Sequence, residues 1–272
     1  MKRPSAMMLT SAVLLAGSSC SVLEDRVSCP CYLDIDYREV LSAGFAEEPE
    51  RKVEVGLFDA ALCWTADHPL ETCPDQEEVS VDKARLRAVA VVHDHPFRSY
   101  LEEGLKISYE AGNQMDALYV HSEEVDCTDE EARCVLRPHK QFSTLTFTDE
   151  ADGELCRRYN MVIRGTTCGF DAFDFSALEG AYLYTVQEDD GQGEVRVRIP
   201  RQKRGDLLLE FWDKDDHLRR FTCPIGLYLF AAGYDPDALD LQDYELRIDF
   251  RAGLLYLRVA DWEDEYLYSL YE

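Results

Sequence analysis

Along most of the chain, hydrophobic and polar residues alternate one by one, which is the pattern of a β-strand with one buried face. The stretches 31–37 (CYLDIDY), 194–199 (EVRVRI) and 244–250 (YELRIDF) show this alternation clearly, whereas residues 80–89 fit either a strand or a short helix. Further predicted strands lie at 53–58, 86–92, 105–109, 117–121, 134–136, 142–147, 159–164, 180–186, 206–212, 218–221 and 255–259. Turns recur about every 8–12 residues, which is typical of β-sandwiches. A parallel α/β fold is disfavoured because no amphipathic helices recur between the strands.

The polar, glycine-containing stretch 148–154 (TDEADGE) predicts a boundary between two halves of the chain. We therefore expect an all-β protein with two antiparallel β-sandwich domains, over residues 31–148 and 149–272. The most apolar run of the second half, 225–230 (IGLYLF), predicts a central buried strand. In 235–239 (DPDAL) an N-cap residue precedes proline, which predicts one or two turns of helix.

The first twenty residues have the features of an export signal. Lys2 and Arg3 form a basic start, and residues 6–17 (AMMLTSAVLLAG) form an uncharged, mostly apolar run. The run is shorter than the about 20 residues that span a hydrocarbon core, but it has the length of a secretory signal. Small residues then lead to Cys20. We expect a signal peptide over residues 1–19 and a polar tether over residues 20–30.

The position of Cys20 resembles that of the lipid-attachment cysteine of bacterial lipoproteins. Gly17 stands where the usual motif has leucine, a relaxed form that is familiar in the Bacteroidota. The resemblance implies a diacylglyceryl thioether on Cys20 and a fatty-acyl group such as palmitate on its amine, and two or more acyl chains hold a protein stably at a membrane. Glu24 and Asp25 resemble the acidic surface-export signal of Bacteroidota lipoproteins. The alternative is an ordinary cleaved signal, with Cys20 as one more cysteine of a secreted chain.

The formal net charge of the 272-residue chain is −26. This charge argues against binding to nucleic acid, whose phosphates require Lys and Arg, and against electrostatic adsorption to anionic lipid. A hydrophobic share of 46% is too high for a disordered chain. The negative charge therefore covers the surface of a folded protein.

Ten cysteines in an exported chain suggest disulfides. Local spacing suggests the pairs Cys63–Cys73, Cys127–Cys134 and Cys156–Cys168, although spacing alone does not establish connectivity. A metal site needs paired cysteine or Cys/His spacing. The Cys29–Pro30–Cys31 stretch has no second pair, so we expect no metal and no cofactor.

The sequence contains no nucleotide-binding or hydrolase signature of the types G-x-G-x-x-G, G-x-S-x-G or H-E-x-x-H, so we expect no catalytic residues. His93 and His95 would share one face of a strand, but Pro96 follows and no third metal ligand is evident. The acidic turn 213–217 (DKDDH) lacks the spaced oxygen ligands of a calcium loop. Aromatic residues on alternating strands more often pack in a core than form a sugar platform. Those of the second half are Tyr182, Tyr184, Phe211, Trp212, Tyr228, Tyr234 and Trp262.

Several short motifs occur in a characteristic order in the second half. Residues 225–236 (IGLYLFAAGYDP) and 239–250 (LDLQDYELRIDF) are followed by 259–262 (VADW). Together with Cys29–Pro30 after the lipoprotein cysteine, and with 140–142 (KQF) before the last strand of the first half, they resemble the fimbrillin-associated anchor lipoproteins of Bacteroidota. The likeness covers nearly all of the mature chain. It implies two transthyretin-like β-sandwich domains in tandem and no catalysis.

The resemblance also implies a surface-exposed outer-membrane lipoprotein that anchors or assembles a fimbria. Subunits of this class join by strand exchange, in which a groove accepts a terminal strand of a neighbour. The implied partners are fimbrial structural or accessory subunits and the outer membrane. The tail 263–272 (EDEYLYSLYE) is an extra edge strand, a strand for a partner or a frayed end. The alternative functions are a surface glycan-binding lipoprotein and a hydrolase whose acid pair is hidden among the 54 Asp and Glu residues.

Overall fold

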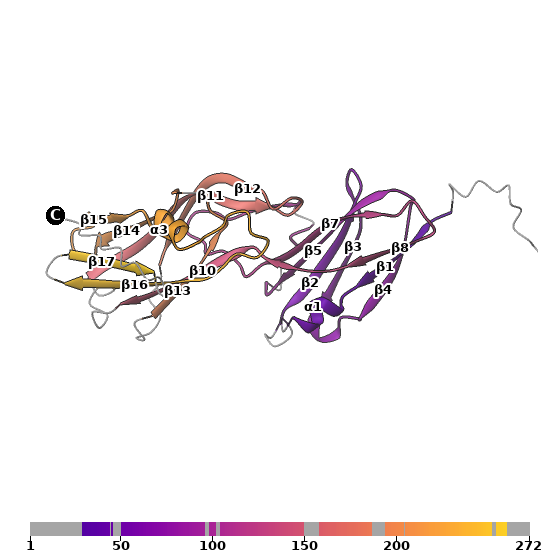
Figure 1. The fold of residues 1–272 in the computed structure, drawn as a ribbon, viewed down its shortest axis with the longest axis horizontal. Coiled ribbons are helices and arrows are strands. Elements are labelled where there is room, and N and C mark those ends of the chain that lie inside the picture. The colour runs from indigo at the N-terminus through magenta and orange to yellow at the C-terminus, as the bar shows by residue number, and fades with distance from the viewer. Residues whose placement is uncertain are drawn as a thin grey trace, which may run out of the picture.

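The computed structural model describes residues 29–43, 45, 50–95, 98–101, 104–149, 158–186, 194–203, 205–251 and 254–259. The molecule is elongated, with two lobes arranged end to end (Figure 1). The early strands form one lobe and the late strands form the other. The strand nearest the N-terminus therefore lies far from the outermost strands of the second lobe.

The regular elements are mostly short strands. The first lobe and the junction contain β1 (Cys31–Asp36), α1 (Arg38–Ser42), β2 (Lys52–Phe58), β3 (Leu62–Pro69), the 3₁₀-helix η3 (Leu70–Thr72), β4 (Gln76–Val81), β5 (Arg85–His93), β6 (Lys106–Ser108), β7 (Tyr119–Asp126), β8 (Glu131–Val135) and β9 (His139–Lys140). The second lobe contains β10 (Phe142–Asp149), β11 (Tyr159–Asp171), β12 (Ala177–Thr185), β13 (Glu194–Pro200), β14 (Leu208–Asp213), β15 (Arg219–Cys223), α3 (Ile225–Ala231), β16 (Tyr244–Arg251) and β17 (Leu254–Val259).

In the first lobe the sheets β4–β1–β8 and β3–β2–β5–β7–β9 enclose one hydrophobic core. Alternation along β1 places Leu33 and Ile35 in this core, whereas Tyr32 faces outward and is 49% exposed. β2 and β5 are buried on both faces, because the loop that contains Tyr100 and Leu101 covers their outer side. A Cβ added to Gly56 of β2 would lie 3.1 Å from Cδ1 of Leu101 in that loop.

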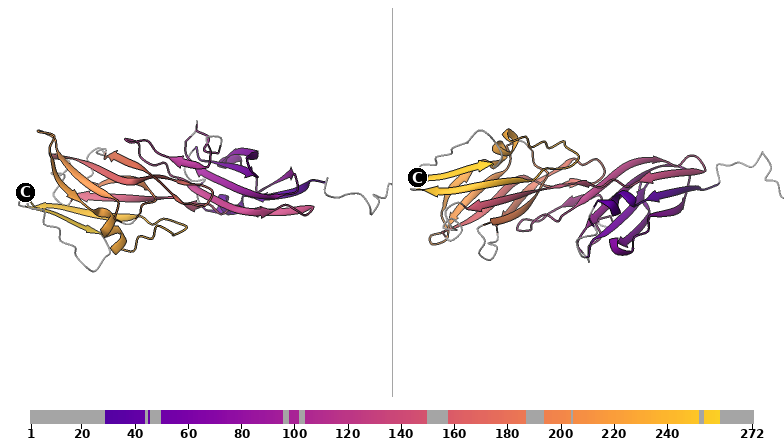
Figure 2. Two further views of the ribbon diagram at one scale, coloured as in Figure 1. Left: turned by 90° about the horizontal axis from the view of Figure 1, so that it is seen from above. Right: turned by 60° about the horizontal axis from the view of Figure 1, so that its bottom comes forward.

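In the second lobe the sheets β12–β11–β14–β15 and β13–β10–β16–β17 form two layers around a second core (Figure 2). The predicted alternation of β13 is confirmed, with Val195 and Val197 inside and Arg196 exposed. The all-β sandwich fold expected from the sequence is therefore confirmed.

A third hydrophobic cluster joins the two lobes, and it contains residues from both halves of the chain. β6 pairs with the end of β11, so that Ile107 lies opposite Phe170, and both side chains are almost fully buried. On either side, the N–H of Tyr109 donates to the carbonyl of Cys168 at 2.9 Å, and the N–H of Ala172 donates to the carbonyl of Leu105 at 2.7 Å. The junction is therefore a packed core with its own strand pairing.

The strand pairing corrects two details of the predicted fold. Among the described strands, β1 pairs with β8 and β10 pairs with β16 in parallel, so the sheets are not purely antiparallel. β10, expected to end the first sandwich at residue 148, pairs instead with β13 and β16 of the second lobe. The sheets therefore divide before β10, which is ahead of the expected boundary at 148–149. The division into two domains stays a proposal.

Two predicted local structures also differ, and one open alternative is resolved. The apolar run at 225–230 is not a strand but the helix α3, which packs Ile225, Tyr228 and Leu229 inward at helical spacing and leaves Leu227 exposed. Residues 235–239 form turns rather than a helix. The uncertain stretch 80–89 contains the end of β4 and the start of β5, not a helix.

Candidate functional site

Cys20, the predicted lipid-attachment residue, lies outside the described residues, so its modification stays a prediction. The predicted signal peptide 1–19, most of the tether and the tail 263–272 lie outside them as well. Among the residues that the structure does describe, no helix is both long enough and apolar enough to cross a lipid bilayer.

The two histidines that could have shared a metal ion lie in different surroundings. His93 at the end of β5 is fully buried, and its Nε2 lies 3.1 Å from Oε1 of Glu54. Its Nδ1 accepts a hydrogen bond from the backbone N–H of His95 at 3.2 Å, and His95 is exposed. Since Nδ1 accepts a hydrogen bond, Nε2 carries the ring proton and donates a hydrogen bond to Oε1 of Glu54. The two imidazoles therefore do not converge on an ion.

Glu54 is a buried carboxylate that holds the loop 98–101 against the sheet. Its Oε2 accepts hydrogen bonds from the backbone N–H groups of Tyr100 at 2.9 Å and Leu101 at 3.3 Å. Burial would raise the pKa of Glu54, but hydrogen bonds from His93, Lys52 and Leu101 outweigh it and lower the pKa below its usual value. The negative charge of Glu54 is used to bind His93, Lys52 and the loop 98–101, which makes Glu54 a poor general acid or base.

A second cluster, formed by His121, Glu123 and Cys134, has the composition of a metal site, with ligand atoms within 4.8 Å of one another. The backbone N–H of Arg137 donates to Nδ1 of His121 at 3.2 Å, so Nε2 carries the proton and faces Sγ of Cys134 at 3.8 Å. A protonated Nε2 has no lone pair for a metal. Burial lowers the pKa of His121 to about 4 and raises that of Cys134 to about 12, so at neutral pH the thiol is neither charged nor nucleophilic.

Every cysteine among the described residues is a free thiol. The predicted disulfides Cys63–Cys73 and Cys127–Cys134 are therefore wrong. The third predicted pair, Cys156–Cys168, includes Cys156, which lies outside the described residues. The thiol of Cys63 instead donates to the carbonyl of Leu57 at 3.0 Å. Cys127 lies beside Cys31, and burial, followed by that neighbouring thiol, raises the pKa of Cys127. Sheet geometry, not spacing along the chain, decides which thiols become neighbours.

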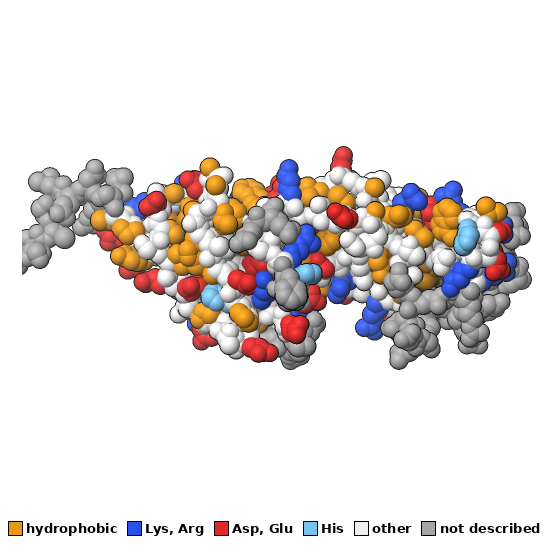
Figure 3. Space-filling view, turned by 180° about the vertical axis from the view of Figure 1, so that it is seen from behind, with side chains coloured by type: hydrophobic (Ala, Val, Ile, Leu, Met, Phe, Trp, Pro, Cys, Tyr) orange, Lys and Arg blue, Asp and Glu red, His pale blue; other side chains and the backbone are white. Residues whose placement is uncertain are grey.

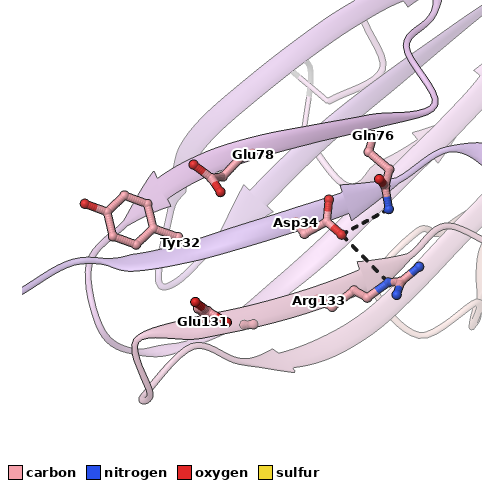
Figure 4. Close-up of a pocket in the computed structure, with 7 residues that line it drawn as sticks. Tyr32, Asp34, Gln76, Glu78, Glu131 and Arg133 are labelled. Atoms are coloured by element: carbon pink, nitrogen blue, oxygen red, sulfur yellow. Dashed lines mark hydrogen bonds and ion pairs between the residues drawn. The ribbon is translucent and has the colours of Figure 1, made fainter.

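The outer face of the sheet β4–β1–β8 forms an open depression of about 820 Å³ (Figure 4). It is lined by Tyr32, Asp34, Gln76, Glu78, Glu131, Ala132 and Arg133. Asp34 in its centre accepts a hydrogen bond from Nε2 of Gln76 at 3.2 Å and lies 3.8 Å from Nε of Arg133. These polar groups bind one another across the three strands, so the face is stabilised without a ligand.

A groove of about 480 Å³ at the junction of the lobes combines positive charge with aromatic rings. We call it the basic groove, and it is lined by Arg51, Gln114, Ala117, Tyr119, Lys140, Phe142, Thr144, Arg196, Arg198 and Asp243. On the face shown in Figure 3, acidic side chains are dispersed among basic and hydrophobic ones. Four cations beside one carboxylate are therefore unusual in a chain whose net charge is −26.

The cations of the basic groove differ in how far they are engaged. Nζ of Lys140 lies 2.5 Å from Oδ1 of Asp243, and Arg196 pairs with the preceding carboxylate of its own strand at 2.8 Å. Arg198 donates through Nε to the carbonyl of Met115 at 2.8 Å. Its two terminal nitrogens have no hydrogen-bond or ion-pair partner among the described residues. Arg198 therefore presents two guanidinium nitrogens to the groove that can still donate hydrogen bonds.

The sequence showed Arg196 and Arg198 as the polar face of a strand but did not show what that face meets. The register of β10 with β13 places Thr144 opposite Arg198, and β9 brings Lys140 to the same groove. No spacing rule connects these positions, because they come from strands separated by more than fifty residues. The groove is therefore a product of the sheet order.

The aromatic residues considered as a sugar platform are mostly core residues. Five of them are at most 9% exposed: Tyr182, Tyr184, Phe211, Tyr228 and Tyr234. Trp212 is half-buried, and Trp262 lies outside the described residues. The acidic turn after β14 is stabilised from within, since Oδ1 of Asp213 accepts the N–H of Asp215 at 2.9 Å and Asp216 pairs with Arg220. The carboxylates of Asp213 and Asp216 are therefore engaged by groups of the protein itself.

No family model matches the chain, and no curated protein matches it. Solved structures do match, and they show that the chain has the fold of adhesion and fimbria-associated proteins from Bacteroidota. The family resemblance seen in the sequence is thus confirmed at the level of the fold.

One similar structure is the fimbrial anchor protein Mfa2 from Porphyromonas gingivalis, at 10% identity and a TM-score of 0.59, covering 88% of this chain and 100% of that one. A candidate adhesin from Bacteroides thetaiotaomicron matches at 16% identity and a TM-score of 0.61, covering 86% and 97%. A candidate polysaccharide-binding protein from the same organism matches at 18% identity and 0.60, covering 89% and 99%.

Proposed function

We propose that this chain is a non-enzymatic lipoprotein of the outer membrane that anchors or assembles a fimbria at the cell surface. The observation that carries the proposal is the match over the full length of a fimbrial anchor protein, which includes both lobes and the junction between them. The lipoprotein-like Cys20 supports the location. It precedes β1, so a lipid there would hold the first lobe near the membrane.

The arrangement of the lobes suits a tether at one end and a partner at the other. β1 begins at the end of the molecule opposite β15 and β17 (Figure 1). Each of these two strands is the last in its sheet and pairs on one side only among the described strands. Backbone groups of such edges accept an added strand. A fimbrial subunit would therefore join the second lobe by strand pairing, away from the membrane.

The membrane tether is tested by cell fractionation. In the source bacterium, the wild-type chain should sediment with the outer membrane, whereas Cys20→Ala should appear in the soluble fraction because it cannot carry the acyl chains. Cys29→Ala is the matched control, since Cys29 is an exposed cysteine that lies nine positions after Cys20. It should remain with the membrane. Retention of Cys20→Ala in the membrane would contradict lipid attachment at this residue.

The fimbrial role is tested separately by deletion of the gene. We expect fimbriae to be shed into the medium or to fail to assemble, and wild-type chain, but not Cys20→Ala, to restore them. Edge strands β15 and β17 should show slower backbone hydrogen exchange in the assembled fimbria than in the isolated chain, because a partner strand protects their amides. Fimbriae that stay fully cell-bound after deletion would contradict the role.

A second candidate function is glycan binding at the cell surface. The basic groove favours it, since the groove combines aromatic rings with hydrogen-bonding side chains. A candidate polysaccharide-binding protein also shares this fold. The two functions are compatible, because the groove lies between the lobes and the edge strands lie at the outer end.

A further inference from the structure

We propose that the basic groove binds a carboxylate-bearing saccharide, with the guanidinium of Arg198 receiving the carboxylate. The inference deepens the glycan-binding candidate, on which it rests, by naming the class of saccharide, and it does not depend on the anchor role. It rests on the composition of the groove, its size and the two terminal guanidinium nitrogens of Arg198, which can still donate hydrogen bonds.

The charge of the groove selects for an anion. Arg51, Lys140, Arg196 and Arg198 line it together with the single carboxylate of Asp243. The formal net charge of the whole chain, −26, repels anions in general. An anion that binds here must therefore make short-range contacts, and an arginine fork offers the bidentate geometry that fits a carboxylate.

The remaining lining residues select for a saccharide. Gln114 and Thr144 offer an amide and a hydroxyl, which suit the hydroxyl groups of a sugar. The ring of Tyr119 is half-buried at the groove, where Cζ of Arg51 lies 5.4 Å and the ring of Phe45 lies 4.4 Å from its centroid. These neighbours hold the ring in place, and its accessible part adds apolar surface that suits the C–H groups of a pyranose. An inorganic anion would use the positive charge but not the amide, the hydroxyl or this apolar surface.

The size of the groove supports a short oligosaccharide segment rather than a protein surface. A volume of about 480 Å³ falls in the range of about 300–1,000 Å³ that is usual for small-ligand pockets. A folded partner would instead need an interface of about 800 Å² on each side. An acidic peptide shares the charge of a uronate but not its ring faces, and it is therefore the competing occupant for the experiment to separate.

The test is calorimetric titration of the chain lacking its signal peptide with trigalacturonate, an alginate trimer and a hyaluronan tetrasaccharide. At low salt at least one of these acidic saccharides should bind. Its methyl ester, which keeps the rings but loses the charges, should bind at least about tenfold more weakly. Arg198→Gln should weaken binding about tenfold. Arg196→Gln should weaken it several-fold, and this side chain is 73% exposed, so the change leaves the fold intact.

Arg85→Gln is the matched control, because Arg85 is 69% exposed on β5 outside the groove. It should leave the affinity unchanged. Failure of all three saccharides to bind at millimolar concentration would overturn the proposal. So would equal binding of the ester, equal loss in Arg85→Gln, or equal affinity for a triglutamate peptide. None of these outcomes bears on membrane release of Cys20→Ala, so the anchor role and the groove are tested independently.

Discussion

Gly169 is the position at which the junction of the lobes depends most directly on one residue type. A Cβ at this position would lie 1.9 Å from the carbonyl oxygen of Ile107 and 2.8 Å from Cα of Ser108. Both are backbone atoms of β6, so no side-chain rotation relieves the overlap. In Gly169→Ala, β6 must move away from β11, which strains their pairing and loosens the burial of Ile107.

The magnitude follows from three contributions. Overpacking costs about 1–3 kcal/mol, and loss of each flanking backbone hydrogen bond costs about 1 kcal/mol. Alanine is favoured over glycine in a strand by about 0.5–1 kcal/mol, which offsets part of the loss. We therefore expect Gly169→Ala to lower the free energy of unfolding by about 2–4 kcal/mol, measured by urea denaturation of the chain without its signal peptide.

Gly165→Ala is the matched control on the same strand. Its added Cβ would lie 2.6 Å from Oε1 of Gln202, which is the end of a flexible side chain. That side chain can shift at the expense of its hydrogen bonds, so we expect a loss of only about 1 kcal/mol. Equal stabilities of the two variants would refute the view that the close backbone approach of β6 and β11 holds the junction.

The remaining predictions concern acid stability and a buried arginine. Burial depresses the pKa of His121 from 6.5 to about 4. Between these pH values the unfolded chain binds a proton on His121 that the folded protein does not bind. The protein therefore loses stability as the pH falls from 6.5 to about 4. His121→Asn should remove this component, at most about 3 kcal/mol, from the difference in urea unfolding between pH 7 and pH 4. An unchanged pH dependence would rule the assignment out. Arg201→Met should cost about 2–4 kcal/mol, because Arg201 donates to the carbonyl of Ala238 and to Oε1 of Gln141 inside the protein. Arg85→Met on the surface should change stability by less than about 0.5 kcal/mol; similar losses in both would show that Arg201 is not a buried anchor.

Much of the fold could be predicted because strand periodicity is a local property. The alternation of Val195 and Val197 with Arg196 specifies a half-buried strand whatever its partners are. β3 escaped prediction because it is an edge strand whose residues are mostly exposed or half-buried, so it shows no hydrophobic alternation. The run at 225–230 was too uniformly apolar to reveal its period, and a helix and a buried strand then look alike.

The candidate sites illustrate the same limit. The His93–Asp94–His95 motif was visible in the sequence, but only the packing showed that His93 donates to Glu54 while His95 faces solvent. The basic groove had no signature at all, since Lys140 and Arg198 become neighbours only through the order of β9, β10 and β13. Charge and hydrogen-bond partners are properties of three-dimensional neighbours, and those are not encoded by spacing.

The sequence by itself determined the all-β class and the position of most strands, because each depends on residues close together along the chain. The tertiary structure alone decided which strands pair. It assigned β10 to the second lobe, made β1–β8 parallel and joined the lobes through Ile107 and Phe170. The physical reason is that backbone hydrogen bonds are the same for every residue type, so a strand's partner is selected by the packing of whole sheets.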